Sequence, residues 1–344
     1  MRLLIITQRV DARDQLLGFF IDWIRKFSEK FEKVTVLCLE RGEFSLPGNV
    51  EVISLGKDRG YPKIGQLFTF YFLLFTLKYD AVFVHMNPIW VILGGMSWRL
   101  MNKKIFFWYT SGGVTTKLKL AEKWANVIFT ASKESFRLPS KKVIVTGHGI
   151  DIRLFQPSEK LKVNPPAGGE KLMILSVGRI APVKNYETLV VAAKILKDKG
   201  IDFSITMVGE APLDSDARYL TSLKLKVESL KLEDNFHFVG KVNHKDLPSY
   251  YQSHDIFIHL SKTGSLDKTI LEAMACGVKV LSSSDSARFF LSSELLFNES
   301  NSSELADKIM AVKDKPTNPV LRDYVIKNHN LDILIEKISR GINP

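Results

Sequence analysis

The stretch LMILSVGRIAPVKN, residues 172–185, carries the pattern that decides the fold. Its first seven residues are mostly apolar on both faces of an extended chain and end at a glycine, which predicts a buried parallel strand. A helix is expected from about Asn185, so a strand, a short loop and a helix follow one another directly. The same order returns on both sides of this stretch, which predicts an α/β protein.

Short apolar runs rich in Val, Ile and Phe alternate with helical patterns along the chain. Helices are expected over residues 15–31 and from about Asn185, Ala217 and Lys268. Two successive strand–helix series predict two doubly wound domains, with ligands bound at the carboxyl ends of the strands in a cleft where the domains face each other. The expected strands are residues 3–7, 34–39, 50–55, 81–85, 104–109, 126–131, 142–147, 172–178, 203–209, 236–240, 255–260 and 278–283.

The segment QPSEKLKVNPPAGGEK, residues 156–171, has three prolines, two glycines and no hydrophobic period, so it is the best linker in the chain. We therefore predict a first domain over residues 1–156, a linker over 157–171 and a second domain over 172–317. The tail, residues 318–344, is expected to form one or two amphipathic helices that can pack back toward the first domain.

The chain has 344 residues and ordinary globular composition, with 45% hydrophobic and 25% charged residues. Its two cysteines, Cys38 and Cys276, cannot form a disulfide framework and fit a reducing cytosol. The first residues, MRLLIITQRV, have only four consecutive apolar positions, so no secretory signal is expected. The longest apolar stretch, residues 64–77, is too short to span a bilayer, which needs about 20 residues. A core helix is favoured there over an interfacial one.

Positive charge is concentrated in the first half of the chain. Residues 1–150 hold 22 Lys and Arg against 12 Asp and Glu, whereas the rest holds 26 against 25. Such an excess suits an anionic partner, namely nucleic acid, a membrane surface or a phosphorylated acceptor. No nucleic-acid-binding module is visible, so nucleic acid is not expected. The remaining choice lies between contact with an anionic membrane, with Arg99, Lys103 and Lys104 as the first patch to test, and a basic protein without such contact.

Two cations follow the strand of the opening stretch. Arg179 and Lys184 lie in the loop that enters the next helix, where a helix N-terminus and two positive charges can bind a diphosphate. Two solvated loop charges are the simpler alternative. The glycine patterns of dinucleotide-binding and P-loop proteins are absent from the sequence.

A second motif is KTGSLDKTILEAMACGVKVLSS, residues 262–283. A polar glycine loop precedes a short helix that is expected to end at Gly277, a good C-terminal cap. Glu272 lies within that helix among apolar neighbours, so it is expected to border the interior and to need a partner. The two hydroxyl groups of a ribose could supply one.

Several stretches together resemble the nucleotide-sugar domain of family-4 glycosyltransferases with the GT-B fold, which consists of two Rossmann-like domains. They are GRIAPVKN (178–185), MVGEAP (207–212), FHFVGKVNHKDLPSYYQSHDIFIHLS (236–261) and LEAMACGVKVLSS (271–283), and TASKESFRLPSKKVIVTGHGID (130–151) resembles the segment before the family's interdomain hinge.

The resemblance implies an enzyme that moves a hexose-type sugar from a nucleotide-diphosphate sugar to a glycan or lipid-linked acceptor. It further implies retention of configuration, independence of metal ions and no cofactor other than the donor. The expected location is cytoplasmic, and peripheral contact at the inner face of the membrane stays open, as does the absence of such contact. A related protein that binds nucleotide sugar or glycan without turnover is the alternative.

The family's functional residues can be carried over position by position. Arg179 and Lys184 match the diphosphate-binding, catalytic pair, and Glu272 matches the glutamate that binds the ribose. The remaining donor-side positions are Gly178, Gly209, Lys241, Val242, Ser265, Leu266, Asp267 and Lys268. Gly18 corresponds loosely to the glycine loop near the donor phosphate and the acceptor.

The sequence departs from the family pattern at two places. Gly264 stands where the family has a glutamate that contacts the donor sugar, and Asp267 or Lys268 could compensate from the same loop. A histidine that touches the sugar in the family is replaced by Thr110 or Ser111.

Two further polar groups need an interpretation. His85 follows a predicted strand and could bind the acceptor or the sugar, or it could be a hydrogen-bonded structural histidine. Asp214-Ser215-Asp216 imitates an aspartate-pair metal motif, but we interpret it as a solvated helix start with Ser215 or Asp216 as the cap. No metal site is expected.

Overall fold

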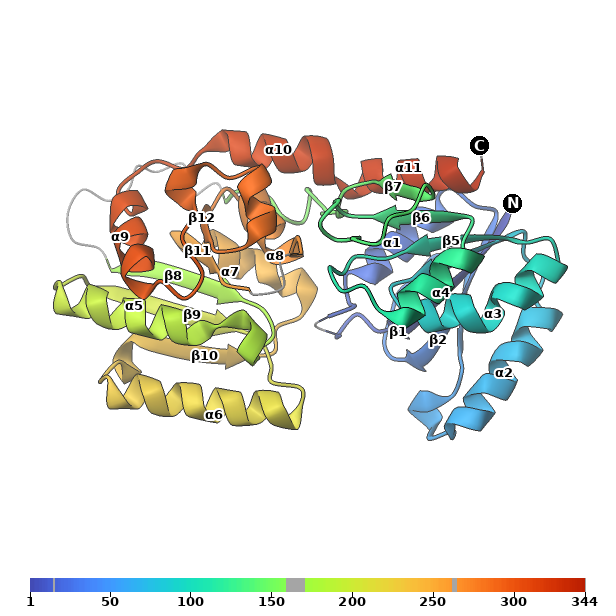
Figure 1. The fold of residues 1–344 in the computed structure, drawn as a ribbon, viewed down its shortest axis with the longest axis horizontal. Helices are drawn as coiled ribbons and strands as arrows, with labels where there is room; N and C mark the ends of the chain where they lie inside the picture. Colours follow the sequence, from blue (N-terminus) through green and yellow to red (C-terminus); the bar gives the residue numbers. More distant parts are fainter. Residues whose placement is uncertain (15, 159–170, 262–264, 344) are drawn as a thin grey trace. The chain divides into compact units, whose positions relative to one another are not determined.

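The chain folds into two α/β units, each built on a parallel sheet (Figure 1). The computed structural model describes residues 1–14, 16–158, 171–261 and 265–343. The first unit comprises Met1–Gly149 with Asn330–Pro344, and the second comprises Ile150–His329. The predicted class, two Rossmann-like domains, is confirmed.

Within the described residues the first unit has a seven-stranded sheet in the order β3-β2-β1-β4-β5-β6-β7, with every neighbouring pair parallel. Leu3 and Ile5 of β1 pack into one hydrophobic cluster and Leu4 and Ile6 into another, so both faces of the sheet are covered. The strands are β1 (Arg2–Val10), β2 (Lys33–Arg41), β3 (Val50–Ser54), β4 (Ala81–His85), β5 (Lys104–Trp108), β6 (Val127–Thr130) and β7 (Val143–Val145).

Helices cover the two faces of this sheet. On one face lie α1 (Phe20–Ser28) and α11 (Leu331–Ile342). The apolar residues of both helices share a cluster with the sheet. On the other face lie α2 (Lys63–Thr76), α3 (Pro88–Leu100) and α4 (Thr116–Trp124).

The second unit, again among described residues, has a five-stranded parallel sheet in the order β10-β9-β8-β11-β12. Of the twelve strands in the described residues, eleven fall within one or two residues of the expected ranges, and β1 is longer than expected. The strands are β8 (Leu172–Val177), β9 (Phe203–Val208), β10 (Phe236–Gly240), β11 (Ile256–His259) and β12 (Lys279–Ser282).

The helices of the second unit also divide between the two faces of its sheet. One face carries α5 (Tyr186–Asp198), α6 (Asp214–Ser229) and α9 (Ser302–Val312), and the other carries α7 (Leu247–Gln252), α8 (Lys268–Ala275) and α10 (Pro319–His329). Helix α8 ends as expected, since Gly277 adopts a φ of +75° and Val278 N–H donates to the carbonyl of Ala273 at 3.1 Å.

The boundaries between the units differ from the predicted domain limits. Ile150 and Phe155, placed in the first domain at the sequence level, pack in the core of the second unit. The two tail helices separate: α10 packs on α8, and Arg322 of α10 donates to the Phe155 carbonyl at 3.0 Å, whereas α11 packs on α1. Most of the predicted linker, residues 159–170, lies outside the described residues.

Helix α2 is not the buried core helix that its composition favours. Only Phe70 and Leu74 of this helix are buried, while Ile64, Phe68 and Phe72 are 83%, 74% and 58% exposed. No helix in the described part of the chain is both long enough and apolar enough to span a membrane.

Candidate active site

Backbone hydrogen bonds join the chain segments at the ends of β8, β9 and β10, at the carboxyl edge of the second sheet. Gly178 N–H donates to the Val208 carbonyl at 2.9 Å, and Gly209 N–H donates to the Gly240 carbonyl at 2.8 Å. A Cβ at Gly209 would lie 1.9 Å from the Gly178 carbonyl oxygen, so only glycine permits this approach. Gly178 and Gly209, both predicted on the donor side, therefore shape the platform on which the charged residues lie.

Arg179 leaves this platform directly after β8 and is half-buried. Its Nε lies 3.8 Å from Oδ2 of Asp216, whose side chain is 4% exposed in the first turn of α6. Asp216 is therefore not the solvated helix cap expected from the sequence, and Leu213 holds the cap position without a side-chain bond. The buried Asp216 carboxylate instead faces the Arg179 guanidinium group at ion-pair distance.

Lys184 ends the short 3-10 helix Pro182–Lys184 that leads into α5. Its side chain turns back toward the end of β8. Lys184 Cε lies so close to Gly178 that a Cβ built on this glycine would be 3.7 Å away from it. The Lys184 ammonium group donates a hydrogen bond to Oδ2 of Asp267, which lies at the N-cap position of α8. The same oxygen accepts a hydrogen bond from Nε2 of His259 at 2.7 Å.

His259 ends β11 and is 2% exposed, and its Nδ1 lies 3.2 Å from the Ser282 hydroxyl at the end of β12. Burial alone would raise the pKa of Asp267, but Lys184 and the hydrogen bond from His259 outweigh it and lower that pKa well below its usual range. Burial lowers the pKa of His259 and outweighs the opposite effect of Asp267. Asp267 is thus an ionised carboxylate that neutralises Lys184.

Glu272 lies in α8 with its side chain 3% exposed. Its Oε1 accepts from His244 Nε2 at 3.1 Å, its Oε2 accepts from the Tyr251 hydroxyl at 3.1 Å, and Lys268 Nζ lies 3.9 Å from Oε1. Burial would raise the pKa of Glu272, but these partners, His244 above all, lower it. Glu272 thus borders the interior, as expected, and its partners are the protein groups His244 and Tyr251. A carboxylate with two such bonds still has lone pairs for a ligand hydroxyl.

The other donor-side positions differ in exposure. Lys241 is exposed and Val242 is buried at the end of β10, Ser265 and Lys268 are half-buried, and Leu266 packs into the core beneath α8. Gly264 lies outside the described residues, so the departure from the family pattern at that position has no structural account.

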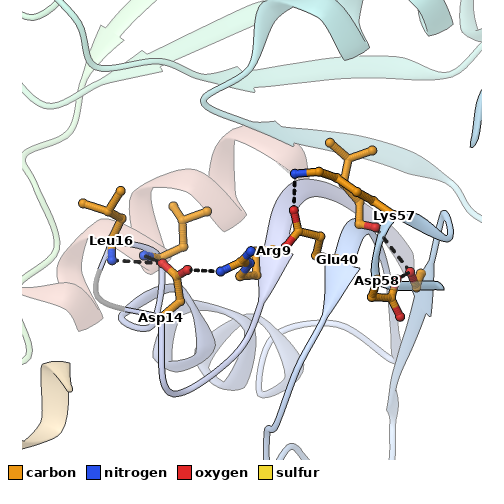
Figure 2. Close-up of polar contacts among 9 residues, drawn as sticks. Arg9, Asp14, Leu16, Glu40, Lys57 and Asp58 are labelled. Atoms are coloured by element: carbon orange, nitrogen blue, oxygen red, sulfur yellow. Dashed lines mark hydrogen bonds and ion pairs between the residues drawn. The ribbon is translucent and has the colours of Figure 1, made fainter. Parts of the chain in front are cut away.

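A polar network fixes the loop between β1 and α1 of the first unit (Figure 2). Arg9 donates to Oδ2 of Asp14 at 2.7 Å and also to Glu40, which accepts a further bond from Lys57. Arg9 and Lys57 outweigh the effect of burial and lower the pKa of Glu40, while Glu40 and Asp14 likewise raise that of Arg9.

Asp14 also shapes the turn that contains Gly18. Its Oδ1 accepts from the N–H group of Leu16 (Figure 2) and from that of Leu17. Its carbonyl accepts from Gly18 N–H. A Cβ at Gly18 would lie 2.5 Å from that carbonyl oxygen, so the loop needs glycine here. Because this turn replaces the first part of the helix predicted from residue 15, α1 begins only at Phe20.

His85, at the end of β4, is 1% exposed. Its Nδ1 lies 3.2 Å from the Thr7 hydroxyl, and its ring stacks on Phe20 with 3.9 Å between centroids. These contacts are those of the structural histidine considered as an alternative. Thr110 and Ser111 follow β5 and are half-buried, and Ser111 N–H donates to the Ser135 carbonyl at 2.8 Å.

Three residues of the second unit that contact the predicted site, His244, Tyr251 and His259, have no assigned role in the sequence-based prediction, and a fourth, Asp216, was interpreted there as a helix cap. Their partners lie 8 to 37 positions away along the chain, so no local motif joins them. The one usable signal is the need of a buried Glu272 for hydrogen-bond donors. No group of three or more His, Cys, Asp or Glu that could hold a metal ion occurs among the described residues.

Comparison with known proteins identifies a protein family for most of the second unit. Residues 157–330 match the protein family described as "Glycosyl transferases group 1". The mannosylfructose-phosphate synthase of Agrobacterium fabrum is 30% identical over 149 residues, which are 42% of this chain and 33% of that protein. The alpha-monoglucosyldiacylglycerol synthase of Streptococcus pneumoniae is also 30% identical over 149 residues, 41% of this chain and 32% of that protein. The chain thus covers about a third of the length of these relatives.

A solved structure extends the likeness over both units. The crystal structure of Anabaena Alr3699/HepE in complex with UDP and glucose has a TM-score of 0.79, with 18% sequence identity, over 99% of each chain. At that identity the likeness shows the fold alone.

Proposed function

Because the chain belongs to the glycosyl transferases group 1 family, we propose that it transfers a hexose-type sugar from a nucleotide-diphosphate sugar to a glycan or lipid-linked acceptor. The observation that supports this most is the position of Arg179 and Lys184. Both follow β8, at the carboxyl edge of a parallel sheet, next to a platform of glycine loops. Ligands of doubly wound folds bind at this edge.

The two cations supply what the reaction needs electrostatically. When the sugar–phosphate bond breaks, negative charge grows on the leaving diphosphate, and Arg179 and Lys184 stabilise it without a metal ion. One such preorganised donor lowers the barrier by about 3–4 kcal/mol. In this proposal Glu272 accepts hydrogen bonds from the ribose, and its bonds from His244 and Tyr251, which leave lone pairs on the carboxylate, support that role.

For the transfer we propose retention by a same-face path. The bond between the anomeric carbon and the phosphate oxygen breaks, and a bond between that carbon and the acceptor oxygen forms on the same face. The proton of the acceptor hydroxyl passes to the oxygen of the leaving phosphate. The sequence offers no well-placed carboxylate nucleophile, and this path needs none.

The acceptor is proposed to be anionic or bound to an anionic membrane, on the cytoplasmic face. The first 150 residues carry the positive excess that such a partner would attract. One relative is named as a synthase of a glucosyldiacylglycerol, a lipid product, which supports a lipid acceptor here.

A binding protein without turnover is the second candidate function, and one structural observation favours it. Each proposed diphosphate cation already faces a carboxylate, Asp216 for Arg179 and Asp267 for Lys184. Cancelled charges stabilise a leaving diphosphate less, and turnover depends on that stabilisation, whereas binding of a nucleotide sugar could still rest on Glu272 and the backbone.

A panel of UDP- and GDP-sugars tests the proposal. Release of UDP or GDP in the presence of protein, lost in the Arg179→Ala variant, is the expected result. Donor binding by calorimetry without release, with glycan and lipid-linked acceptors supplied, would instead favour the binding protein.

A further inference from the structure

The solvent-facing side of α2 is a row of large apolar side chains. Ile64, Phe68, Phe72 and Phe75 are 83%, 74%, 58% and 62% exposed. Their spacing of four, four and three residues places them on one side of the helix, away from the buried Phe70 and Leu74. We refer to these four residues as the α2 stripe. Helices of soluble domains normally present polar residues on this side.

The neighbouring helix α3 carries further apolar side chains that are exposed. The Tyr71 hydroxyl of α2 donates to the Leu93 carbonyl of α3 at 3.0 Å, so the two helices are in contact (Figure 1). Met96 and Leu100 of α3 are 62% and 78% exposed. Exposed apolar side chains thus occur on two adjoining helices, a concentration that marks an interaction site rather than the usual scatter of single residues.

Basic residues border both ends of the α2 stripe. Lys63, the first residue of α2, precedes Ile64, and Lys78 follows just beyond the end of the helix, and both are exposed. Between Arg59 and Tyr79 the sequence has no Asp or Glu. Over residues 55–124 there are ten Lys and Arg against three Asp and Glu. Phenylalanines flanked by lysines fit the boundary of an anionic bilayer, where rings enter the acyl region and ammonium groups meet phosphates.

From this combination we propose that the α2 stripe docks the protein on the surface of an anionic lipid bilayer. The helix lies in the interface and does not cross it, since its 14 residues are too few to span the hydrocarbon core. A second copy of the chain fits less well, because two such surfaces would bring their lysines together. Docking on a bilayer would bring the protein to a membrane-bound acceptor, and in this respect the proposal rests on the proposed function. Binding of the α2 stripe to lipid itself needs neither donor nor acceptor.

Co-sedimentation of the full chain with vesicles tests the proposal. Vesicles of equal parts phosphatidylglycerol and phosphatidylcholine are expected to bind the protein at least about tenfold better than vesicles of phosphatidylcholine alone. The double variant Phe68→Glu/Phe72→Glu is expected to lose binding by at least about tenfold, because it removes two rings that would enter the acyl region of the bilayer and adds negative charge.

The matched control is Phe289→Glu, which changes an equally exposed phenylalanine (70%) of the second unit and is expected to bind like the wild type. Since all three phenylalanines are exposed, thermal unfolding of the variants is expected to stay close to wild type. If the double variant nevertheless unfolds early, Lys63→Gln/Lys78→Gln carries the test, with weaker binding to the anionic vesicles expected.

Three results would overturn the proposal. They are no sedimentation of the wild type with anionic vesicles, equal loss in the Phe289→Glu control, and a wild-type dimer in lipid-free light scattering that the double variant converts to a monomer. Vesicle binding together with absent nucleotide release would contradict the proposed function alone, so the two failures can be told apart.

Discussion

Replacing Asp267 with Asn removes the negative charge that faces the Lys184 ammonium group and keeps the shape of the side chain at position 267. We expect Asp267→Asn to bind UDP or GDP more tightly and to be less stable than the wild type. The two effects have one cause, because the carboxylate that stabilises Lys184 in the free protein competes with the diphosphate for the same ammonium group.

The size of the effect follows from the contacts. A phosphate oxygen bound to Lys184 would lie about 5 Å from the Asp267 carboxylate, and two unit charges at about 5 Å repel by about 3 kcal/mol at an effective dielectric constant of about 20. The Asp267 side chain is 25% exposed, so screening reduces this to about 1–2 kcal/mol, or about five- to thirtyfold in Kd. Loss of the ion pair is expected to cost less stability than the about 3–5 kcal/mol of a fully buried pair.

Isothermal calorimetry with UDP and GDP, alongside thermal unfolding, measures both effects in wild type, Asp267→Asn and Lys184→Ala. Asp307→Asn is the control, because it removes an exposed ion pair with Lys199 elsewhere in the same unit. Affinity that falls in Asp267→Asn as far as in Lys184→Ala would refute the reasoning, since Asp267 would then position the lysine for the ligand rather than compete with it.

Three other predictions concern the same site. Arg179→Ala and Lys184→Ala are each expected to reduce turnover at least about a hundredfold in steady-state assays, and unchanged rates would contradict the site assignment. Saturating EDTA is expected to leave the rate of nucleotide release unchanged, whereas a strict need for Mg²⁺ or Mn²⁺ would contradict electrostatic catalysis by the two cations. Because the pKa of Asp267 is lowered in the fold, its ionised form stabilises the protein above the unfolded pKa of about 3.9, and this stability is lost as the pH falls further. Chemical unfolding at pH 7 and at about pH 2.5, well below that unfolded pKa, should therefore show a larger loss for wild type than for Asp267→Asn.

The sequence predicts the two sheets well because parallel strands buried on both faces leave a strong signal. Strands β4 and β10 coincide with the expected ranges, and the end of α8 follows from Gly277. Helix α2 was predicted to be buried because a short apolar run has the same composition whether a protein core or another apolar phase covers it. Only the fold shows that one side of this helix faces outward.

The sequence predicts some residues of the site and misses their partners. Arg179, Lys184 and Glu272 stand in local motifs, so sequence spacing can single them out. The carboxylates and hydrogen-bond donors that face them come from other strands and helices, as Asp216 does for Arg179 and His244 does for Glu272. Such pairs depend on strand order, and the sequence alone does not provide it.

A crystal structure of the protein with UDP or GDP bound tests the central claim most directly. The account predicts the diphosphate at the carboxyl end of β8, in contact with the Arg179 guanidinium and the Lys184 ammonium groups, with the Asp267 carboxylate released from Lys184. A diphosphate bound elsewhere, or bound while Lys184 still contacts only Asp267, would contradict it.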